Sequence, residues 1–397
     1  MKEFPLDNVT VIDFTQILAG PFCTMLLADM GANVIKIEKP NGGDDTRRFG
    51  PPFVNGESVA FIGINRNKRS MVLDLKTEIG IDVARSMIAK ADVMIQNSRP
   101  GAMERMGLNY ERVCVDNPGL IYCSVSGFGA TGPYGNKAGF DLVAQGMSGL
   151  MSITGLPGSP PIKVGVPIAD FNTGMYSTYA ILSAYIHKLK TGKGQHVDAS
   201  LLDSAIAYTL YESMAYFATG DVATPVGSAH RMIAPYQAFA TSDGYINVAA
   251  ANQSNWVRMC NAIGRKDLLE ESRFSSNSER MINISELTPI MDRTFSKEST
   301  VYWVTLLEKA GVPCGPIYNM AQVYADPQVR ARNMAVELDH PVAGKIKNIG
   351  VPVKLSETPG DIYRPAPTLG QHTLEILSEF GFSTDEIARY KELGAVQ

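Results

Sequence analysis

Short apolar strands alternate with amphipathic helices through the first 200 residues. Residues 9–14 form a β-rich run, residues 21–30 have the spacing of a helix that Gly31 ends, and a second apolar run follows at residues 33–38. This is the pattern of a strand–helix–strand unit. It recurs with expected strands at 70–75, 92–96 and 120–125, and with expected helices at 78–90 and 101–117. The alternation predicts an α/β fold with a mainly parallel sheet covered on both faces.

The amino-acid composition of the chain changes after residue 220. Before it, residues 172–190 predict a long helix, and residues 196–201 lead into a helical run that reaches residue 219. From 220 to about 253 the chain is rich in Gly, Pro, Thr and Ser, with short aromatic strands at 236–240 and 245–250. Helices are expected at 256–263, 279–295 and 300–310, and the tail has short strands and a final helix at 373–380. We therefore expect a large α/β domain and a smaller second region.

Charge and cysteine content exclude several classes of protein. Lys and Arg total 36 against 40 Asp and Glu, for a net charge of -4, so the 397-residue chain has no diffuse basic field for nucleic acid or an acidic membrane. The five cysteines lack C-x-x-C spacing and the five histidines are isolated from one another, so we expect neither disulfides nor a metal site. No apolar stretch approaches ~20 residues, and residues 1–8 do not resemble a signal peptide. We expect a cytoplasmic protein with no membrane or nucleic-acid partner.

The first strand-to-helix turn, residues 15–21, holds a single glycine. It therefore lacks the G-x-G-x-x-G fingerprint of dinucleotide-binding sheets and the glycine-rich phosphate loop. The G-x-S-x-G motif of serine hydrolases is also absent from the sequence. These absences argue against a nicotinamide oxidoreductase, an ATPase and a serine hydrolase.

Basic and polar side chains follow several of the predicted strands. In a parallel sheet the carboxyl ends of the strands line the ligand crevice. A polyanionic ligand with an aromatic head, such as a nucleotide or coenzyme A, would suit such cations. The alternative, that they are solvated surface charges, stays open. The residues are Lys39, Arg47, Arg48, Asn67, Lys68, Arg69, Lys76, Asn97, Ser98, Arg99, Arg105 and Lys137.

Asp170 stands in a mostly apolar segment, residues 164–174, at the expected start of a helix. A carboxylate there is favoured by free backbone N–H groups and by the helix dipole. Asp170 could serve only as a helix N-cap. The functional alternative is a nucleophilic carboxylate in a site whose backbone amides tolerate an anion.

Taken together, several motifs resemble class III coenzyme A transferases, the family of formyl-CoA transferase, carnitine CoA-transferase and α-methylacyl-CoA racemase. The resemblance runs from about residue 7 to the LGQHT motif at 369–373. Segments at 43–47, 50–52 and 229–239 are most similar to the succinyl-CoA–dicarboxylate and acetyl-CoA–oxalate subgroups. The motifs are VIDFT (11–15), AGP (19–21), GANVIKIE (31–38), NKRS (67–70), PG (100–101), GFG (127–129) and KTGKGQ (190–195).

The resemblance implies a fold, an assembly and a set of site residues. It implies a large Rossmann-like domain of residues 1–220 together with 330–397, a linker and small α+β domain at 221–329, and an interlocked homodimer. Asp170 matches the family's nucleophile. Two features depart from formyl-CoA transferase: Leu18 replaces a glutamine, and the glycine-rich loop of the small domain has no clear counterpart. The implied coenzyme A contacts are Leu18, Ala19, Lys39, Leu73, Asp74, Leu75, Lys76, Asn97, Ser98, Arg99, Arg105, Lys137, Ala138, Gly139 and Phe140.

The implied activity is transfer of coenzyme A from an acyl-CoA, such as succinyl-CoA, to a small carboxylate. Coenzyme A is then a substrate, and no permanently bound cofactor is expected. The family's racemases place a histidine where this chain has Phe140. Because a phenyl ring cannot exchange a proton, Phe140 favours a transferase over a racemase. A non-catalytic acyl-CoA-binding protein is a further alternative, against which the intact Asp170 argues.

The acceptor is expected to be a dicarboxylate. A second carboxylate needs a cation or several hydrogen-bond donors, and His230 and Arg231 open the smaller region. Arg is well suited to a fork-like contact with a carboxylate. The alternative is that Arg231 is an exposed loop residue.

Overall fold

The computed structural model describes residues 3–397, so the first two residues of the expected large domain lie outside the described part. The chain divides into two compact units. The larger comprises Met1–Met151, Lys163–Asp221 and Pro327–Gln397, and the smaller comprises Ser152–Ile162 and Val222–Asp326. The segment 152–162, which the sequence analysis left in the large domain, therefore groups with the smaller unit.

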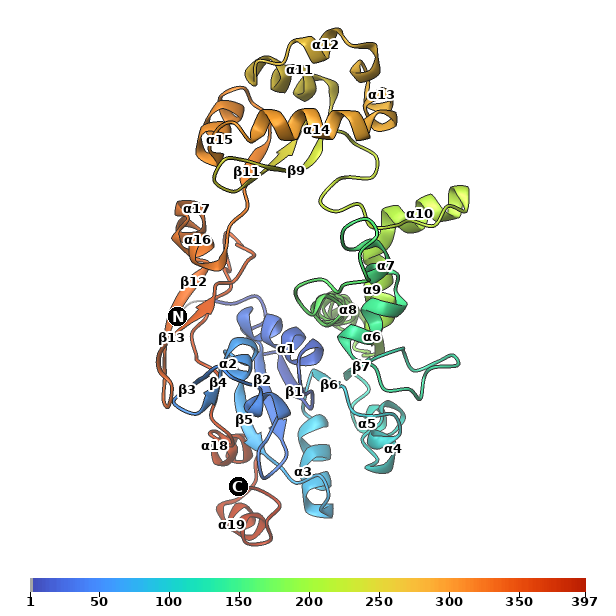
Figure 1. Ribbon diagram of the computed structural model, residues 1–397. Coiled ribbons are helices and arrows are strands. Elements are labelled where there is room, and N and C mark those ends of the chain that lie inside the picture. The colour runs from blue at the N-terminus through green and yellow to red at the C-terminus, as the bar shows by residue number, and fades with distance from the viewer. Residues whose placement is uncertain (1–2) are drawn as a thin grey trace. The chain divides into compact units, whose positions relative to one another are not determined.

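A six-stranded parallel sheet forms the centre of the larger unit (Figure 1). The strand order is β5-β2-β1-β6-β7-β8, and every neighbouring pair runs parallel. The predicted α/β fold with a parallel sheet is confirmed. The strands are β1 (Thr10–Asp13), β2 (Asn33–Glu38), β5 (Arg69–Val72), β6 (Val93–Gln96), β7 (Ile121–Ser126) and β8 (His196–Ser200).

Helices cover both faces of this sheet because its strands are apolar on both sides. Ile12, Ile35 and Met71 face a core shared with α3 (Glu78–Ile88) and α18 (Thr373–Glu379). On the other face α1 (Ala19–Asp29) packs along α8 (Ile168–Thr191), which also contacts β7 and β8. A parallel sheet buried on both faces requires such continuous apolar strands.

Three helix predictions were wrong in detail. The stretch 101–117 is two helices, α4 (Ala102–Arg105) and α5 (Tyr110–Asp116), because Gly107 between them has a left-handed φ of 64°. The stretch 279–295 is divided at Asn283 into α13 (Asn277–Ile282) and α14 (Ile284–Phe295). The helix at 373–379 is not the last, because Ser383 caps a further helix, α19 (Thr384–Glu392).

The remaining elements of the larger unit are short. They are η1 (Asp45–Arg48), β3 (Phe53–Val54), β4 (Glu57–Ser58), α2 (Val59–Ile64), α6 (Asp141–Met147), α9 (Leu201–Ile206), η2 (Ala207–Thr209), α10 (Leu210–Thr219), α17 (Pro327–Ala331), β12 (Ala335–His340) and β13 (Gly344–Ile349). The helix α7 (Leu150–Ile153) crosses the boundary between the units.

The smaller unit is α+β, as expected. Its antiparallel sheet, in the order β11-β10-β9, packs against helices around buried Phe239, Trp256 and Phe295. The strands are β9 (Tyr236–Ala240), β10 (Tyr245–Ala249) and β11 (Cys314–Pro316). The other helical segments are α11 (Gln253–Ala262), α12 (Asp267–Glu270), η3 (Ser272–Phe274), α15 (Thr300–Lys309) and α16 (Met320–Ala325). Among the residues the structure describes, no helix is long and apolar enough to cross a membrane.

Arg66 and Asn67 attach the C-terminal segment to the larger unit. Arg66 forms a buried bidentate ion pair with Asp29 at the end of α1, at 2.9 and 2.6 Å, and also donates to Asn348 in β13. The Asn67 side chain donates to Asp29 and Asp361 O and accepts from the backbone N–H groups of Tyr363 and Arg364. The NKRS motif therefore begins with a residue, Asn67, that joins chain segments about 300 positions apart.

Replacing Arg66 by Met should destabilise the protein strongly. It leaves the buried Asp29 carboxylate without its main partner, and breaking a buried pair from one side costs roughly 3–5 kcal/mol. The control is Arg85→Met, because the Arg85–Asp82 pair is exposed and exposed pairs contribute about 0–1 kcal/mol. Denaturant unfolding would measure both variants. Equal losses would contradict the role of the Arg66–Asp29 pair.

Candidate functional site

Two adjoining hollows lie at the carboxyl ends of the sheet strands. The first is lined from β2 and from the segment after β5, and the second from the ends of β6 and β7 and from Asp170. Both include Gln16 and Ser98, so the two hollows share a wall. Ligands of open parallel sheets bind at this edge. These hollows therefore form the candidate site.

The loop after β1 separates the hollows and has an unusual backbone conformation. Ile17 has a φ of 74°, in the left-handed region that a β-branched residue rarely adopts. Such a conformation costs on the order of 1–3 kcal/mol and persists only where neighbouring groups enforce it. Asn97 holds one side, because its side chain accepts from Gln16 N at 2.9 Å and donates to Gln16 O at 2.7 Å.

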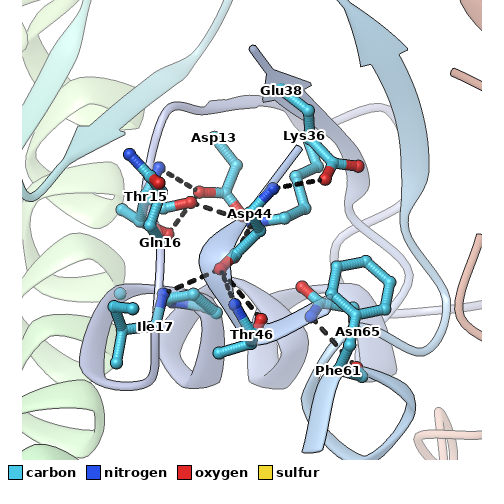
Figure 2. A network of polar contacts seen from close by, with 12 residues as sticks. Asp13, Thr15, Gln16, Ile17, Lys36, Glu38, Asp44, Thr46, Phe61 and Asn65 are labelled. Atoms are coloured by element: carbon cyan, nitrogen blue, oxygen red, sulfur yellow. Dashed lines mark hydrogen bonds and ion pairs between the residues drawn. The ribbon is translucent and has the colours of Figure 1, made fainter. Parts of the chain in front are cut away.

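Asp44 holds the other side of the loop, as Figure 2 shows. Its Oδ1 accepts hydrogen bonds from Ile17 N at 3.2 Å and from Thr46 N and Oγ1. Its Oδ2 is 2.8 Å from Lys36 Nζ, and Lys36 also donates to Thr15 O. The side chains of Lys36 and Asp44 are completely buried. Two fully buried charges thus support the loop from beneath.

A second buried pair extends this network. Lys68 Nζ is 3.3 Å from Asp13 Oδ2 and donates to Asn65 and to Pro21 O. Burial opposes the charge on Asp44, but the Lys36 charge and the hydrogen bonds of Lys36 and Thr46 outweigh it, so the pKa of Asp44 is lowered. At Lys68, by contrast, burial dominates and lowers the pKa to about 8 despite the charge of Asp13.

Asp170 lies in the first turn of α8 and is half-buried. The N-cap of α8 is Pro167, so Asp170 is not the N-cap that one alternative expected. Within residues 3–397 its carboxyl group makes no hydrogen bond to another side chain or to the backbone. Burial and, second, the nearby negative charge of Asp141 raise the pKa of Asp170 to about 7. An ionised Asp170 is therefore a high-energy group facing the second hollow.

Asp141 connects the start of α8 to α6. Its Oδ1 accepts from Ala169 N at 2.9 Å, and its Oδ2 accepts from Gln145 Nε2 at 2.7 Å. Gln145 in turn accepts from Val164 N at 2.9 Å. Asp141 thus satisfies one of the free N–H groups in the first turn of α8. This arrangement fixes the backbone of Asp170 while leaving its carboxyl group open to the hollow.

Most residues expected from the resemblance lie together in these hollows. Lys39, Leu73, Asp74, Leu75 and Lys76 line the first, Ser98 lines both, and the others line the second: Leu18, Ala19, Asn97, Arg99, Lys137, Ala138, Gly139, Phe140 and Asp170. Lys39 is paired with Asp45 at 2.7 Å, and Lys137 lies 3.8 Å from the centre of the Tyr134 ring. Their ligand contacts stay predictions.

Eight expected residues do not line the hollows: Arg47, Arg48, Asn67, Lys68, Arg69, Arg105, His230 and Arg231. Arg105 is exposed on α4, although Met103 and Met106 of the same segment line the first hollow. His230 and Arg231 belong to the smaller unit. There the His230 ring contacts the Tyr236 ring, and Met232 N donates to His230 Nδ1.

Sequence reasoning missed the support beneath the site. Lys36 could have been noticed, because it is a charged residue inside the otherwise apolar strand β2. Nothing in the sequence indicates that Asp44, rather than Asp45 next to it, turns inward to Lys36. Among residues 3–397 no group of three or more His, Cys, Asp or Glu side chains could hold a metal ion.

Replacing Asp170 by Asn should change how stability depends on pH. The carboxyl group has a pKa of about 7 when folded against 3.8 ordinarily, so the folded state binds the proton more tightly. Stability contributed by the protonated group is therefore present at pH 4 and lost as pH rises to about 7. Wild type should lose this free energy of unfolding as pH rises from 4 to 7, whereas Asp170→Asn should not. The stability of Asp170→Asn relative to wild type should therefore increase by on the order of 2–4 kcal/mol over this pH range.

Unfolding by urea at pH 4.5, 6 and 8 would measure this difference. The exposed Asp203 in the first turn of α9 provides the control variant Asp203→Asn. A constant difference between wild type and Asp170→Asn at all three pH values would contradict the raised pKa.

Comparisons with known proteins identify the family. Residues 6–373 match the model of CoA-transferase family III. Human succinyl-CoA:glutarate CoA-transferase is 43% identical over 94% of this chain and 86% of its own length, and succinate–glutarate CoA-transferase of Agrobacterium fabrum is 42% identical over 95% and 96%. A solved CAIB/BAIF family protein from Brucella suis is 40% identical, with a TM-score of 0.85 over 96% of this chain and 100% of that one. The chain belongs to CoA-transferase family III and is a CoA-transferase enzyme.

Proposed function

We propose that this enzyme transfers coenzyme A from succinyl-CoA to a small dicarboxylate, with Asp170 as the covalent nucleophile. The observation that carries the proposal is the position of Asp170. Its carboxyl group is half-buried without a hydrogen bond among the described residues, and it lines the same hollow as Leu18, Ala19 and Lys137. A nucleophilic carboxylate needs this combination of access and weak stabilisation.

The reaction proceeds in four acyl-transfer steps. The Asp170 carboxylate attacks the thioester carbonyl of succinyl-CoA, and the C–S bond breaks to give a mixed anhydride and coenzyme A thiolate. The thiolate attacks the Asp170 carbonyl of the anhydride, which releases succinate and leaves an aspartyl-CoA thioester. The acceptor carboxylate then attacks this thioester to form a second anhydride. The released thiolate attacks the acceptor's carbonyl carbon, which yields the new acyl-CoA and frees Asp170.

Burial of Asp170 favours these covalent intermediates. Burial and, second, the negative charge of Asp141 destabilise the free carboxylate and raise its pKa. An anhydride or thioester at this position is neutral, so its formation removes the charge that the site disfavours. The transferred charge leaves on the thiolate or on the released carboxylate. The site therefore lowers the cost of acylating Asp170 by destabilising the reactant rather than by binding it.

The choice of substrates rests on the relatives. The human and Agrobacterium proteins named above carry succinyl-CoA or succinate and glutarate in their names. For this chain we propose a C4–C6 dicarboxylate as acceptor. Arg231 remains the predicted partner of its second carboxylate, and the homodimer implied by the resemblance remains a prediction.

Asp170→Asn should abolish transfer while coenzyme A binding is retained. The amide lacks a nucleophilic oxygen, so activity should fall by about 10⁴-fold or more. With wild type, hydroxylamine during turnover should modify Asp170 and no other carboxylate, as peptide mass spectrometry can determine. Asp203→Asn should retain normal activity, because Asp203 is exposed and lines neither hollow. Activity of purified Asp170→Asn near the wild-type value would exclude Asp170 as the nucleophile.

A panel of donors and acceptors would test the substrate class. Succinyl-CoA and acetyl-CoA would each be paired with glutarate, malate, itaconate, oxalate, butyrate and carnitine, and acyl-CoA products identified by mass spectrometry. We expect succinyl-CoA with C4–C6 dicarboxylates to give the highest kcat/KM. Efficient transfer to the monocarboxylates alone would contradict the dicarboxylate proposal, and binding of coenzyme A without any transfer would favour a non-catalytic protein.

A further inference from the structure

Among the described residues that line the two hollows, Ile17 is the only non-glycine residue with a positive φ, and the mechanism above gives it no role. Its backbone is left-handed, with a φ of 74°. The five other non-glycine residues with positive φ among those described are all asparagine, the residue type that tolerates this conformation best after glycine. A β-branched residue there must be held by its surroundings.

The constraint on Ile17 comes from a buried acid. Asp44 Oδ1 accepts the Ile17 N–H at 3.2 Å and the Thr46 N–H at 2.9 Å, while its Oδ2 is paired with Lys36 at 2.8 Å. Lys36 also donates to Thr15 O at 2.8 Å, two residues before Ile17. Figure 2 shows these contacts converging beneath the loop. The ion pair therefore binds the loop at both ends of its sharp bend.

The bend sets where the wall of the second hollow lies. Ile17, Leu18 and Ala19 follow one another along that wall, with Asp170 in the same hollow. Beyond the wall the chain is rigidly packed, since the Phe22 ring lies edge-on to the Phe171 ring and a Cβ on Gly174 would be 2.8 Å from Ala19 O. Because α1 is fixed against α8 in this way, the conformation of Ile17 decides the position of the loop relative to Asp170.

We propose that Asp44, paired with Lys36, is a positioning residue that forces Ile17 into its left-handed conformation and thereby places the reacting thioester against Asp170. Asp44 contacts the loop backbone through its side chain and lies beneath it. This inference rests on the proposed function for its kinetic consequence, but its structural half stands on the geometry alone. Misplacement of reacting groups by about 1 Å costs about 10²-fold in rate.

The test removes Asp44 and then compares two second substitutions at Ile17, one to glycine and one to valine. In Asp44→Ala the Ile17 backbone should relax to negative φ, so adduct formation at Asp170 should slow by about tenfold or more. Adding Ile17→Gly should restore much of this rate, because glycine adopts positive φ without steric cost. Adding Ile17→Val should not, because valine is β-branched like isoleucine. The Val variant is the control that changes residue 17 while keeping a β-branched side chain, which disfavours positive φ.

Two readouts separate positioning from stability. The first is the single-turnover rate of the Asp170 adduct from succinyl-CoA, followed by intact-protein mass spectrometry. The second is hydrogen exchange of the peptide that contains residues 15–19, which should be faster in Asp44→Ala because the Ile17 N–H has lost its acceptor. Arg69→Met, which removes ion pairs to Glu375 and Glu379 outside both hollows, should lower stability without changing either readout.

If Asp44→Ala does not fold, Lys36→Met/Asp44→Ala replaces it, because removing both charges leaves neither of them buried without its partner. Rescue by glycine and not by valine supports the proposal. Equal rates for the glycine and valine double variants overturn it, as does wild-type exchange of residues 15–19 in Asp44→Ala. If wild type itself forms no adduct, the proposed function fails, and the exchange measurement still decides whether Asp44 constrains the loop.

Discussion

Four fully buried charges beneath the first loop are the constraint on which the candidate site depends. Asp13 and Lys36 lie in the adjacent strands β1 and β2. Lys68 directly precedes β5, and Asp44 directly precedes η1. Removing charges from water is costly, so each must find its partner when the sheet forms. Lys36 and Asp44 pair at 2.8 Å, and Lys68 and Asp13 at 3.3 Å. The network therefore couples the correct folding of β1, β2 and the 42–46 turn to the shape of the hollow.

The surroundings of Asp170 differ from those of the buried acids Asp13 and Asp44. Asp13 and Asp44 each receive a lysine and hydroxyl or amide donors, and the pKa of each is lowered even though burial opposes their ionisation. Asp170 receives no such donor among the described residues, and burial together with Asp141 raises its pKa. The larger unit thus stabilises the charges of Asp13 and Asp44 with hydrogen bonds and ion pairs, whereas the Asp170 carboxylate at the hollow has no such partner among the described residues. Differences of this kind between neighbouring groups are typical of functional sites.

The region around Asp141 shows how that difference is maintained. Asp141 accepts from the N–H of Ala169, the residue before Asp170, and its charge discourages ionisation of Asp170. Asp141 and Gln145 also fix the approach to α8 through Val164. A single carboxylate therefore anchors the backbone and raises the energy of the neighbouring carboxylate. The two effects have the same origin, because an acceptor that satisfies the helix end also carries the negative charge.

The sequence determined the larger part of the fold. Strand–helix alternation predicted the parallel sheet, since periodic apolar residues report burial directly, and β2 has the predicted bounds of residues 33–38. The motif resemblance selected Asp170 and a set of expected contacts, and most of these residues line the two hollows. Where the sequence failed, the cause was local. Helix 101–117 is interrupted at Gly107, and α19 depends on the Ser383 cap, features that periodicity averages over.

Only the tertiary structure decided which charges turn inward. Asp44 and Asp45 are adjacent and chemically identical, yet Asp44 is buried and paired with Lys36, while Asp45 is partly exposed and paired with Lys39 and Arg48. The choice depends on the direction of the chain after β2 and on a partner eight residues earlier. The left-handed Ile17 is equally invisible in sequence, because the residue type argues against it and the contacts that hold the loop come from Asn97, Lys36 and Asp44, which are distant along the chain. Local propensity records what each residue prefers, whereas burial and pairing between distant segments decide what it adopts.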